Sequence, residues 1–104
     1  HGGRQLEGSR SPFAQLKEIV DAVGDDIDVI MDSGVQRGSH VLKALAAGAK
    51  AVGGGRFYLY ALAAAGQAGV ERALEIMRTE IERNMRLMGV SKISELIRNH
   101  LRYR

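Results

Sequence analysis

Two glycine-rich loops, each with an arginine, hold the residues of this chain that are best suited to chemistry. The first loop, residues 32–38, follows an apolar segment and carries Asp32 and Arg37. The second loop, residues 53–56, follows another apolar segment and consists of three glycines and Arg56. Glycine lets backbone N–H groups approach a ligand closely, and arginine binds phosphate oxygens through paired hydrogen bonds. Together the two loops predict a phosphate-binding site.

The elements that flank these loops must position them. Apolar residues at helical spacing predict a helix over 12–23, which Ser11 caps and Gly24 ends. Apolar runs predict buried parallel strands over 27–31 and 49–52. In α/β proteins the functional residues lie at the C-terminal ends of such strands. The other expected elements are a helix from about Ser39 to Gly48, a short helix over 57–65 broken at Gly66, a long helix over 68–88 followed by Gly89, and a last helix capped by Ser91.

The long predicted helix carries an apolar stripe rich in methionine. Its members are Val70, Ala73, Leu74, Met77, Ile81, Met85 and Met88. A stripe with this spacing is typical of a helix that packs on a protein core, so we expect it to pack against the sheet rather than to hold a cofactor.

The alternation of helices with short apolar strands is typical of βαβ units with right-handed crossovers. Two strands alone cannot form a stable sheet that is covered on both faces, and a complete (β/α)8 barrel needs roughly 250 residues. We therefore expect an α/β fold, the C-terminal part of a (β/α)8 TIM barrel with strands seven and eight and the closing helices. The start at His1, in a glycine-rich loop without a methionine, favours the same interpretation: the upstream part of one barrel domain is absent from residues 1–104.

The composition excludes several classes of protein. The chain has 104 residues, 45% of them hydrophobic, which is enough to bury a modest core. It has no cysteine, which excludes disulfides and thiol chemistry and fits a reducing compartment such as the cytoplasm. A net charge of +3 from mixed acids and bases does not predict nucleic-acid binding, and no apolar run is long enough to span a membrane.

Four segments of the chain form a recognisable set: His-Gly-Gly-Arg-Gln-Leu at 1–6, Asp-Ser-Gly-Val-Gln-Arg-Gly at 32–38, Lys-Ala-Leu-Ala at 43–46 and Gly-Arg at 55–56. In this order they resemble the FMN-dependent L-2-hydroxy-acid oxidase and dehydrogenase family. The family includes glycolate oxidase, lactate oxidase, mandelate dehydrogenase and the flavocytochrome lactate dehydrogenases. The resemblance covers nearly the whole chain. It implies FMN as the cofactor and the oxidation of a lactate-like L-2-hydroxy acid to the 2-oxo acid.

The resemblance implies two roles in substrate chemistry. His1 matches the family's catalytic base, which takes the proton of the substrate α-hydroxyl, and a neutral imidazole is available for this near neutral pH. Arg4 matches the arginine that binds the substrate carboxylate, which guanidinium holds at two points. Without the other motifs, both residues would be interpreted as part of a loose terminal loop.

The resemblance also implies the cofactor contacts. The segment that touches the FMN ribityl chain and phosphate is matched by Asp32, Ser33, Gly34, Val35 and Gln36. Gly55 and Arg56 match the phosphate clamp. Taken singly, Asp32 could instead be a turn or helix cap and Arg56 an exposed surface arginine, but two glycine–arginine loops on adjacent strands favour the cofactor site.

Three positions depart from the family pattern. The family usually has arginine at the position of Gln36, an apolar residue at Gly54 and proline at Phe57. The first departure removes one positive charge from the phosphate site, and Arg37 could supply it from the next position. His40, expected to be exposed in the first turn of a helix, and His100 show no metal-ligand spacing, so we expect no metal.

Two alternatives remain open at this point. The first is another FMN-dependent TIM-barrel enzyme, against which the loop at residues 1–4 argues. The second is a small basic helical module that binds a partner through residues 98–104. For the leading interpretation, the expected partners are a small 2-hydroxy acid, the N-terminal remainder of the barrel and, from the resemblance, further copies in a tetramer. The resemblance also allows peripheral association with a membrane.

Overall fold

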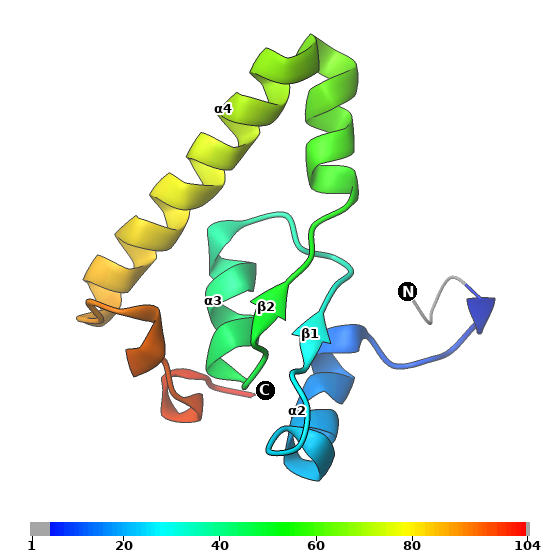
Figure 1. The fold of residues 1–104 in the computed structure, drawn as a ribbon, viewed down its shortest axis with the longest axis vertical. Coiled ribbons are helices and arrows are strands. Elements are labelled where there is room, and N and C mark those ends of the chain that lie inside the picture. Colours follow the sequence, from blue (N-terminus) through cyan, green and yellow to red (C-terminus); the bar gives the residue numbers. More distant parts are fainter. Residues whose placement is uncertain (1–4, 104) are drawn as a thin grey trace.

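The computed structural model describes residues 5–103 and shows a chain of helices around two short strands (Figure 1). The order is α2 (Pro12–Val23), β1 (Ile30–Met31), α3 (Gly38–Ala46), β2 (Ala51–Val52) and α4 (Arg56–Met88), followed by the 3-10 turns η1 (Ile93–Glu95) and η2 (Arg98–His100). This order confirms the predicted alternation of helix and strand.

β1 and β2 are parallel neighbours, with Ile30 opposite Ala51 and Met31 opposite Val52. Two further backbone hydrogen bonds extend the pairing, from Lys50 N–H to the Val29 carbonyl and from Gly53 N–H to the Met31 carbonyl, each 2.8 Å. The strands are shorter than the predicted ranges of 27–31 and 49–52, because the described residues offer no third strand to lengthen the ladder.

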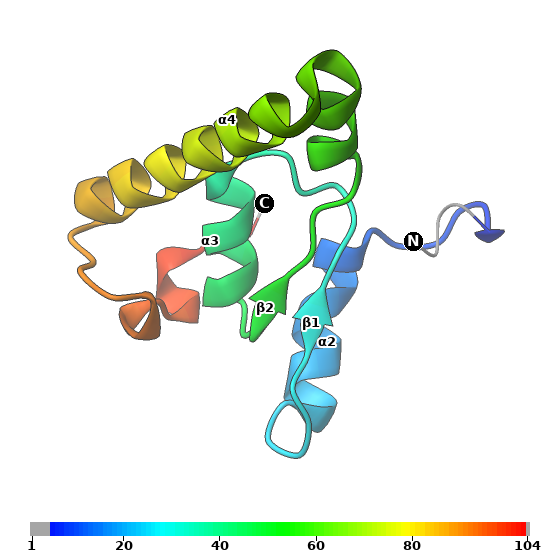
Figure 2. The ribbon, with the colours of Figure 1, turned by 45° about the horizontal axis from the view of Figure 1, so that its top comes forward.

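The two helices between and before the strands lie on the same side of the sheet (Figures 1 and 2). The buried residues of this layer form one core cluster, which consists of Leu16, Met31, Val35, Ala44, Ala47 and Ala49. α2 begins as predicted, with the Ser11 hydroxyl accepting the Ala14 N–H at 3.2 Å. On the other side of the sheet Ile30 is 66% exposed, as expected for two strands that cannot by themselves form a sheet covered on both faces.

α4 is two helical pieces joined at a sharp bend. Ala65 and Gly66 have non-helical backbone angles, which confirms the break predicted at Gly66. The helix ends at Gly89, which adopts the left-handed conformation (φ 70°) that favours glycine at this position. α4 packs mainly on α3 rather than on the sheet, and Leu74 of its apolar stripe is 55% exposed. The stripe is therefore only half-buried.

The C-terminal residues fold back over α3 toward α2 (Figure 1). The rings of Phe13 and Tyr103 stack with centroids 6.4 Å apart, and Arg98 forms an ion pair with Asp21. The last helix predicted from Ser91 is instead two 3-10 turns. Ser91 does not cap a helix with its hydroxyl but donates it, together with its N–H, to the Glu95 carboxylate. Within residues 5–103, no helix is both long and apolar enough to cross a bilayer.

Candidate cofactor-binding site

The loop after β1 has an unusual backbone. Ser33 and Gly34 both have φ of 74°, so two successive residues adopt the left-handed region. A non-glycine residue there costs of order 1–2 kcal/mol and is enriched where a site needs a special backbone shape. The Ser33 hydroxyl lies 3.4 Å from Oδ1 of Asp32, to which it can donate. The loop thus holds Asp32 at the strand end and turns the chain sharply toward α3.

The loop after β2 leads directly into the first turn of α4. The Gly55 carbonyl accepts the N–H groups of Tyr58 and Leu59 at 3.2 and 3.3 Å, and Arg56 is the first helical residue. The earliest N–H groups of a helix have no acceptor within the helix and carry the positive end of its dipole. This end of α4 therefore suits an anion, with the Arg56 side chain beside it.

Both loops lie at the same end of the two parallel strands (Figure 1) and line one pocket of about 320 Å³. Its lining residues are Asp32, Ser33, Gly34, Gln36, Gly53, Gly54, Gly55, Arg56 and Leu59. The strand ends approach closely, since a Cβ on Gly53 would lie 3.2 Å from the Cβ of Asp32. A Cβ on Gly34 or Gly55 would meet nothing within 4 Å, so these glycines border open space that a ligand can fill.

The pocket offers one carboxylate, one guanidinium and several backbone groups. Asp32 can accept hydrogen bonds from hydroxyl groups, and Arg56 with the start of α4 can bind a phosphate. A polyhydroxylated chain that ends in a phosphate matches this set of donors and acceptors. Among residues 5–103, no cluster of three or more histidine, aspartate or glutamate side chains could hold a metal ion.

Two of the sequence-predicted residues lie outside the pocket. The Val35 side chain is 6% exposed and belongs to the core, so only its backbone could face a ligand. The Arg37 guanidinium pairs with Glu80 of α4, with Nε and Nη2 at 3.3 and 3.2 Å from Oε1. In this arrangement Arg37 supports the loop rather than supplying the charge that Gln36 lacks.

Glu80 is a supporting residue that sequence reasoning missed. Its second carboxylate oxygen accepts the Gly38 N–H at 2.8 Å and so caps the start of α3 from another helix. This backbone hydrogen bond, with a smaller contribution from the Arg37 charge, lowers the pKa of Glu80 from its ordinary value of 4.5. No local motif marks such a cap, because its two partners lie far apart in the sequence.

His40 is a second missed residue. It is half-buried rather than exposed as predicted, and its Nδ1 accepts the backbone N–H of Gln36 at 3.3 Å. The imidazole therefore ties down the pocket loop from the first turn of α3. Its sequence position put it in that turn, but only the folded structure shows that the ring turns back toward residue 36.

The predicted substrate residues, His1 and Arg4, lie outside the described residues. The structure therefore bears on the cofactor half of the predicted site. The substrate half stays a prediction.

Comparisons with known proteins place this geometry in a family. The model of the FMN-dependent dehydrogenase family matches residues 1–103. The chain is 52% identical over 101 residues to an L-lactate dehydrogenase (cytochrome) of Saccharomyces cerevisiae, covering 92% of this chain and 17% of the relative. It is 46% identical over 97 residues to a pre-mycofactocin synthase of Mycolicibacterium smegmatis, covering 93% and 24%.

A solved structure shows the same arrangement of elements. The structure of a soluble mutant of the membrane-associated (S)-mandelate dehydrogenase from Pseudomonas putida is 41% identical, with a TM-score of 0.92 over 100% of this chain and 29% of that one. The chain thus spans less than a third of the length of each of these three proteins. Because the family model matches almost every residue, the chain belongs to the FMN-dependent dehydrogenase family.

Proposed function

We propose that residues 1–104 are the C-terminal segment of a single FMN-binding (β/α)8 barrel domain, with β1 and β2 as strands seven and eight. Three observations support this proposal. The strands are parallel neighbours, α2 and α3 lie on one side of them, and the chain spans 29% of a mandelate dehydrogenase that it matches in structure. The exposed face of Ile30 and the outer edge of β1 suit the remainder of the barrel, which would cover them.

We further propose that the complete protein oxidises a lactate-like L-2-hydroxy acid to the 2-oxo acid. The observation that carries this proposal is the pocket between the two strand ends, in a chain that the family model matches over residues 1–103. The relatives named for L-lactate and (S)-mandelate support the substrate class. FMN, when bound, supplies the acceptor for the hydride equivalent that leaves the substrate α-carbon.

The pocket residues fit the ribityl phosphate part of FMN. Asp32 would accept hydrogen bonds from ribityl hydroxyls, while Ser33, Gly34, Val35 and Gln36 would offer backbone groups to the chain and phosphate. Gly55 and Arg56 would hold the phosphate at the start of α4, where the helix dipole adds to the guanidinium charge. Arg37 would act indirectly, by anchoring the loop to Glu80.

The substrate residues follow from the first loop of the chain. His1 would take the proton from the α-hydroxyl oxygen, and Arg4 would hold the carboxylate with two hydrogen bonds. The two-point grip fixes the orientation of the α-carbon as well as the position of the charge. Because His1 would remove the proton and Arg4 would bind the substrate, substitutions of the two residues can be tested independently.

The complete protein provides the test. We expect purified protein to be yellow, and we expect its flavin absorption to bleach when it is mixed anaerobically with L-lactate. D-Lactate controls for stereochemistry, and L-alanine controls for the need for a hydroxyl group. The 2-oxo acid should form in a one-to-one ratio with the bound flavin. If the protein is yellow but no L-2-hydroxy acid bleaches it, the proposed activity is wrong and only the proposed cofactor binding is supported.

A second candidate is an FMN-dependent reaction on a different substrate. The chain is 46% identical to a pre-mycofactocin synthase, a relative that is not named for a 2-hydroxy acid. Because this identity is close to the 52% shared with the L-lactate dehydrogenase, the second candidate stays open. Reduction by L-lactate or L-mandelate would reject this candidate.

We also propose that the complete protein is cytoplasmic and forms a tetramer. Gel filtration with light scattering measures the oligomeric state.

A further inference from the structure

The backbone of the loop after β1 has little support of its own. Among the residues that the structure describes, residues 33–36 take part in no hydrogen bond between two backbone groups. Ser33 and Gly34 also keep φ of 74°, which costs free energy at the non-glycine residue. The shape of this loop therefore depends on contacts from side chains.

The imidazole of His40 makes one such contact. Its Nδ1 accepts the backbone N–H of Gln36 at 3.3 Å, and the half-buried ring lines a cavity of about 370 Å³. Ser33 and Gly34 line both this cavity and the cofactor pocket. The loop is thus a wall that the cavity and the cofactor pocket share, and His40 holds it from the side of the cavity.

The contact between His40 and Gln36 requires a neutral imidazole. A neutral ring has one nitrogen that accepts a hydrogen bond, whereas both nitrogens of the protonated ring are donors. Here the acceptor is Nδ1, because its partner is a backbone N–H. A proton taken up at Nδ1 therefore breaks the bond and releases the Gln36 backbone.

Few charged groups surround His40. Within residues 5–103, the start of α2 and β1 contribute uncharged residues to the cavity wall, and α3 contributes Lys43. Arg37 lies one turn before His40 and pairs with Glu80, whose pKa is lowered from 4.5. Histidine is the one side chain whose ordinary titration falls between pH 5 and 8. In the described part of the chain, His40 is therefore the group at this loop that changes charge in that range.

We propose that neutral His40 is a positioning residue of the cofactor pocket, and that protonation of its ring weakens FMN binding. The proposal rests on the proposed function, because it concerns the affinity of the pocket for FMN. Without the bond to His40, the strained loop relaxes, and a smaller fraction of the apoprotein has the shape that binds the cofactor. The dissociation constant rises in inverse proportion to that fraction. Loss of one neutral hydrogen bond corresponds to roughly three- to tenfold.

Two substitutions of His40 in the complete protein separate its hydrogen bond from its charge. His40→Asn keeps an acceptor, because the amide oxygen lies as far along the side chain as Nδ1 and does not titrate. His40→Leu removes the acceptor. Fluorescence titration of each apoprotein with FMN at pH 8 should give His40→Asn the parental dissociation constant within about twofold, and His40→Leu one that is roughly three- to tenfold higher.

The same titrations at pH 5.5 test the protonation. The phosphate of FMN itself takes up a proton near pH 6, so the parent is compared with His40→Asn, in which this effect is the same. Between pH 8 and pH 5.5 the parent should lose roughly three- to tenfold more affinity than His40→Asn does. His40→Leu should show the smaller pH dependence of His40→Asn.

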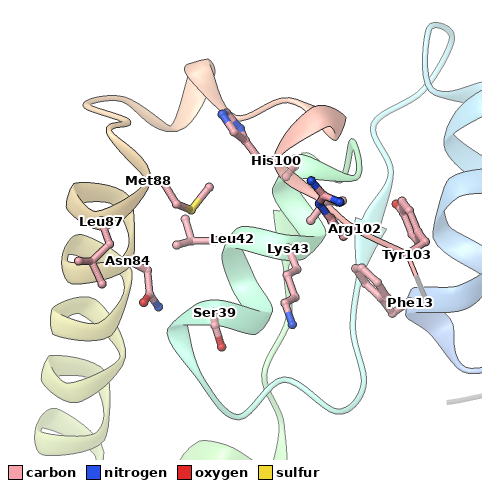
Figure 3. Close-up of a pocket in the computed structure, with 12 residues that line it drawn as sticks. Phe13, Ser39, Leu42, Lys43, Asn84, Leu87, Met88, His100, Arg102 and Tyr103 are labelled. Atoms are coloured by element: carbon pink, nitrogen blue, oxygen red, sulfur yellow. The ribbon is translucent and has the colours of Figure 1, made fainter.

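His100→Leu is the matched control. The Nδ1 of His100 accepts the backbone N–H of Ile97 at 3.2 Å, so the contact is of the same kind. His100 lines a different pocket, together with Leu42 and Met88 (Figure 3). Its replacement should leave both the FMN dissociation constant and its pH dependence at the parental values.

Three outcomes would overturn the proposal. The first is a His40→Asn variant that loses as much affinity in acid as the parent does. The second is a His40→Leu variant that unfolds at a lower temperature but binds FMN like the parent, since His40 would then only cap α3. The third is a parent that binds no FMN at either pH, which would overturn the cofactor site as well. Bleaching by L-lactate tests the proposed activity separately, because these titrations contain no substrate.

Discussion

The carboxylate of Glu80 accepts the backbone N–H of Gly38 at 2.8 Å across 42 residues of sequence. This bond joins the start of α3 to the middle of α4, and the Arg37 guanidinium reinforces it. The contact is close, because a Cβ on Gly38 would lie 2.6 Å from the backbone nitrogen of Ile81. The pocket loop ends at this point, so the crossing of the two helices fixes where residues 32–37 lie.

Glu80→Gln should lower the unfolding temperature of the complete protein at neutral pH. The pKa of Glu80 is lowered in the folded state, so its charge stabilises the fold above its ordinary value of 4.5, and this contribution is lost as the pH falls through the folded value. Thermal unfolding from pH 7 to pH 3 should therefore show a difference between parent and variant that shrinks toward acid. Glu71→Gln is the control, and its difference from the parent should stay small throughout. A Glu80→Gln difference that grows in acid would contradict the assignment.

Arg56→Ala should weaken FMN binding more than Arg37→Ala does. Arg56 lines the pocket at the start of α4, whereas the Arg37 side chain is paired with Glu80. Loss of a charge-assisted contact with phosphate corresponds to roughly ten- to a hundredfold in affinity. Fluorescence titration of the apoprotein with FMN measures both dissociation constants. The opposite order would show that Arg37 reaches the phosphate and that its pairing with Glu80 is not kept in the complex.

Gly69→Ala should destabilise the protein, against the usual trend for helices. In an ordinary helix interior, replacing glycine by alanine stabilises by about 0.5–1 kcal/mol. Here a Cβ on residue 69 would lie 2.1 Å from the Ala61 carbonyl oxygen across the bend of α4. We expect a net loss of about 1–3 kcal/mol, the range for overpacking, measured by urea unfolding. Stabilisation by this change would mean that the two pieces of α4 lie farther apart than the structure shows.

The sequence predicted several features that depend on local physics, although the helix expected from Ser91 is instead two 3-10 turns. The cap at Ser11, the break at Gly66 and the left-handed end at Gly89 each follow from one residue and its neighbours. It did not predict the Glu80 cap or the turn of the His40 ring, because both depend on which helix crosses which. The strand lengths were also wrong, since a strand is as long as its partners allow and β1 has one partner among residues 5–103.

The candidate site divides in the same way. The two glycine–arginine loops were predicted to meet because parallel strands end at one edge of a sheet, and they line one pocket. Arg37 was interpreted as a charge for the phosphate, yet it pairs with a residue of α4. Adjacent residues of an extended loop point in different directions. A sequence motif therefore predicts the loop but not the direction of each side chain.

Substitutions of His1 and of Arg4 in the complete protein should impair flavin reduction and substrate binding to different extents. His1→Gln keeps a polar side chain but removes the base, so it should slow flavin reduction by two or more orders of magnitude while substrate affinity changes little. Arg4→Lys keeps the positive charge but loses the two-point grip, so it should raise the substrate dissociation constant and slow reduction as well. Stopped-flow flavin reduction over a range of L-lactate concentrations separates the rate from the affinity. FMN content should match the parent in both variants, because the proposed roles of both residues concern the substrate and not the cofactor. A His1 variant that reduces its flavin at the parental rate would remove histidine from the reaction and leave only the cofactor-binding half of the site.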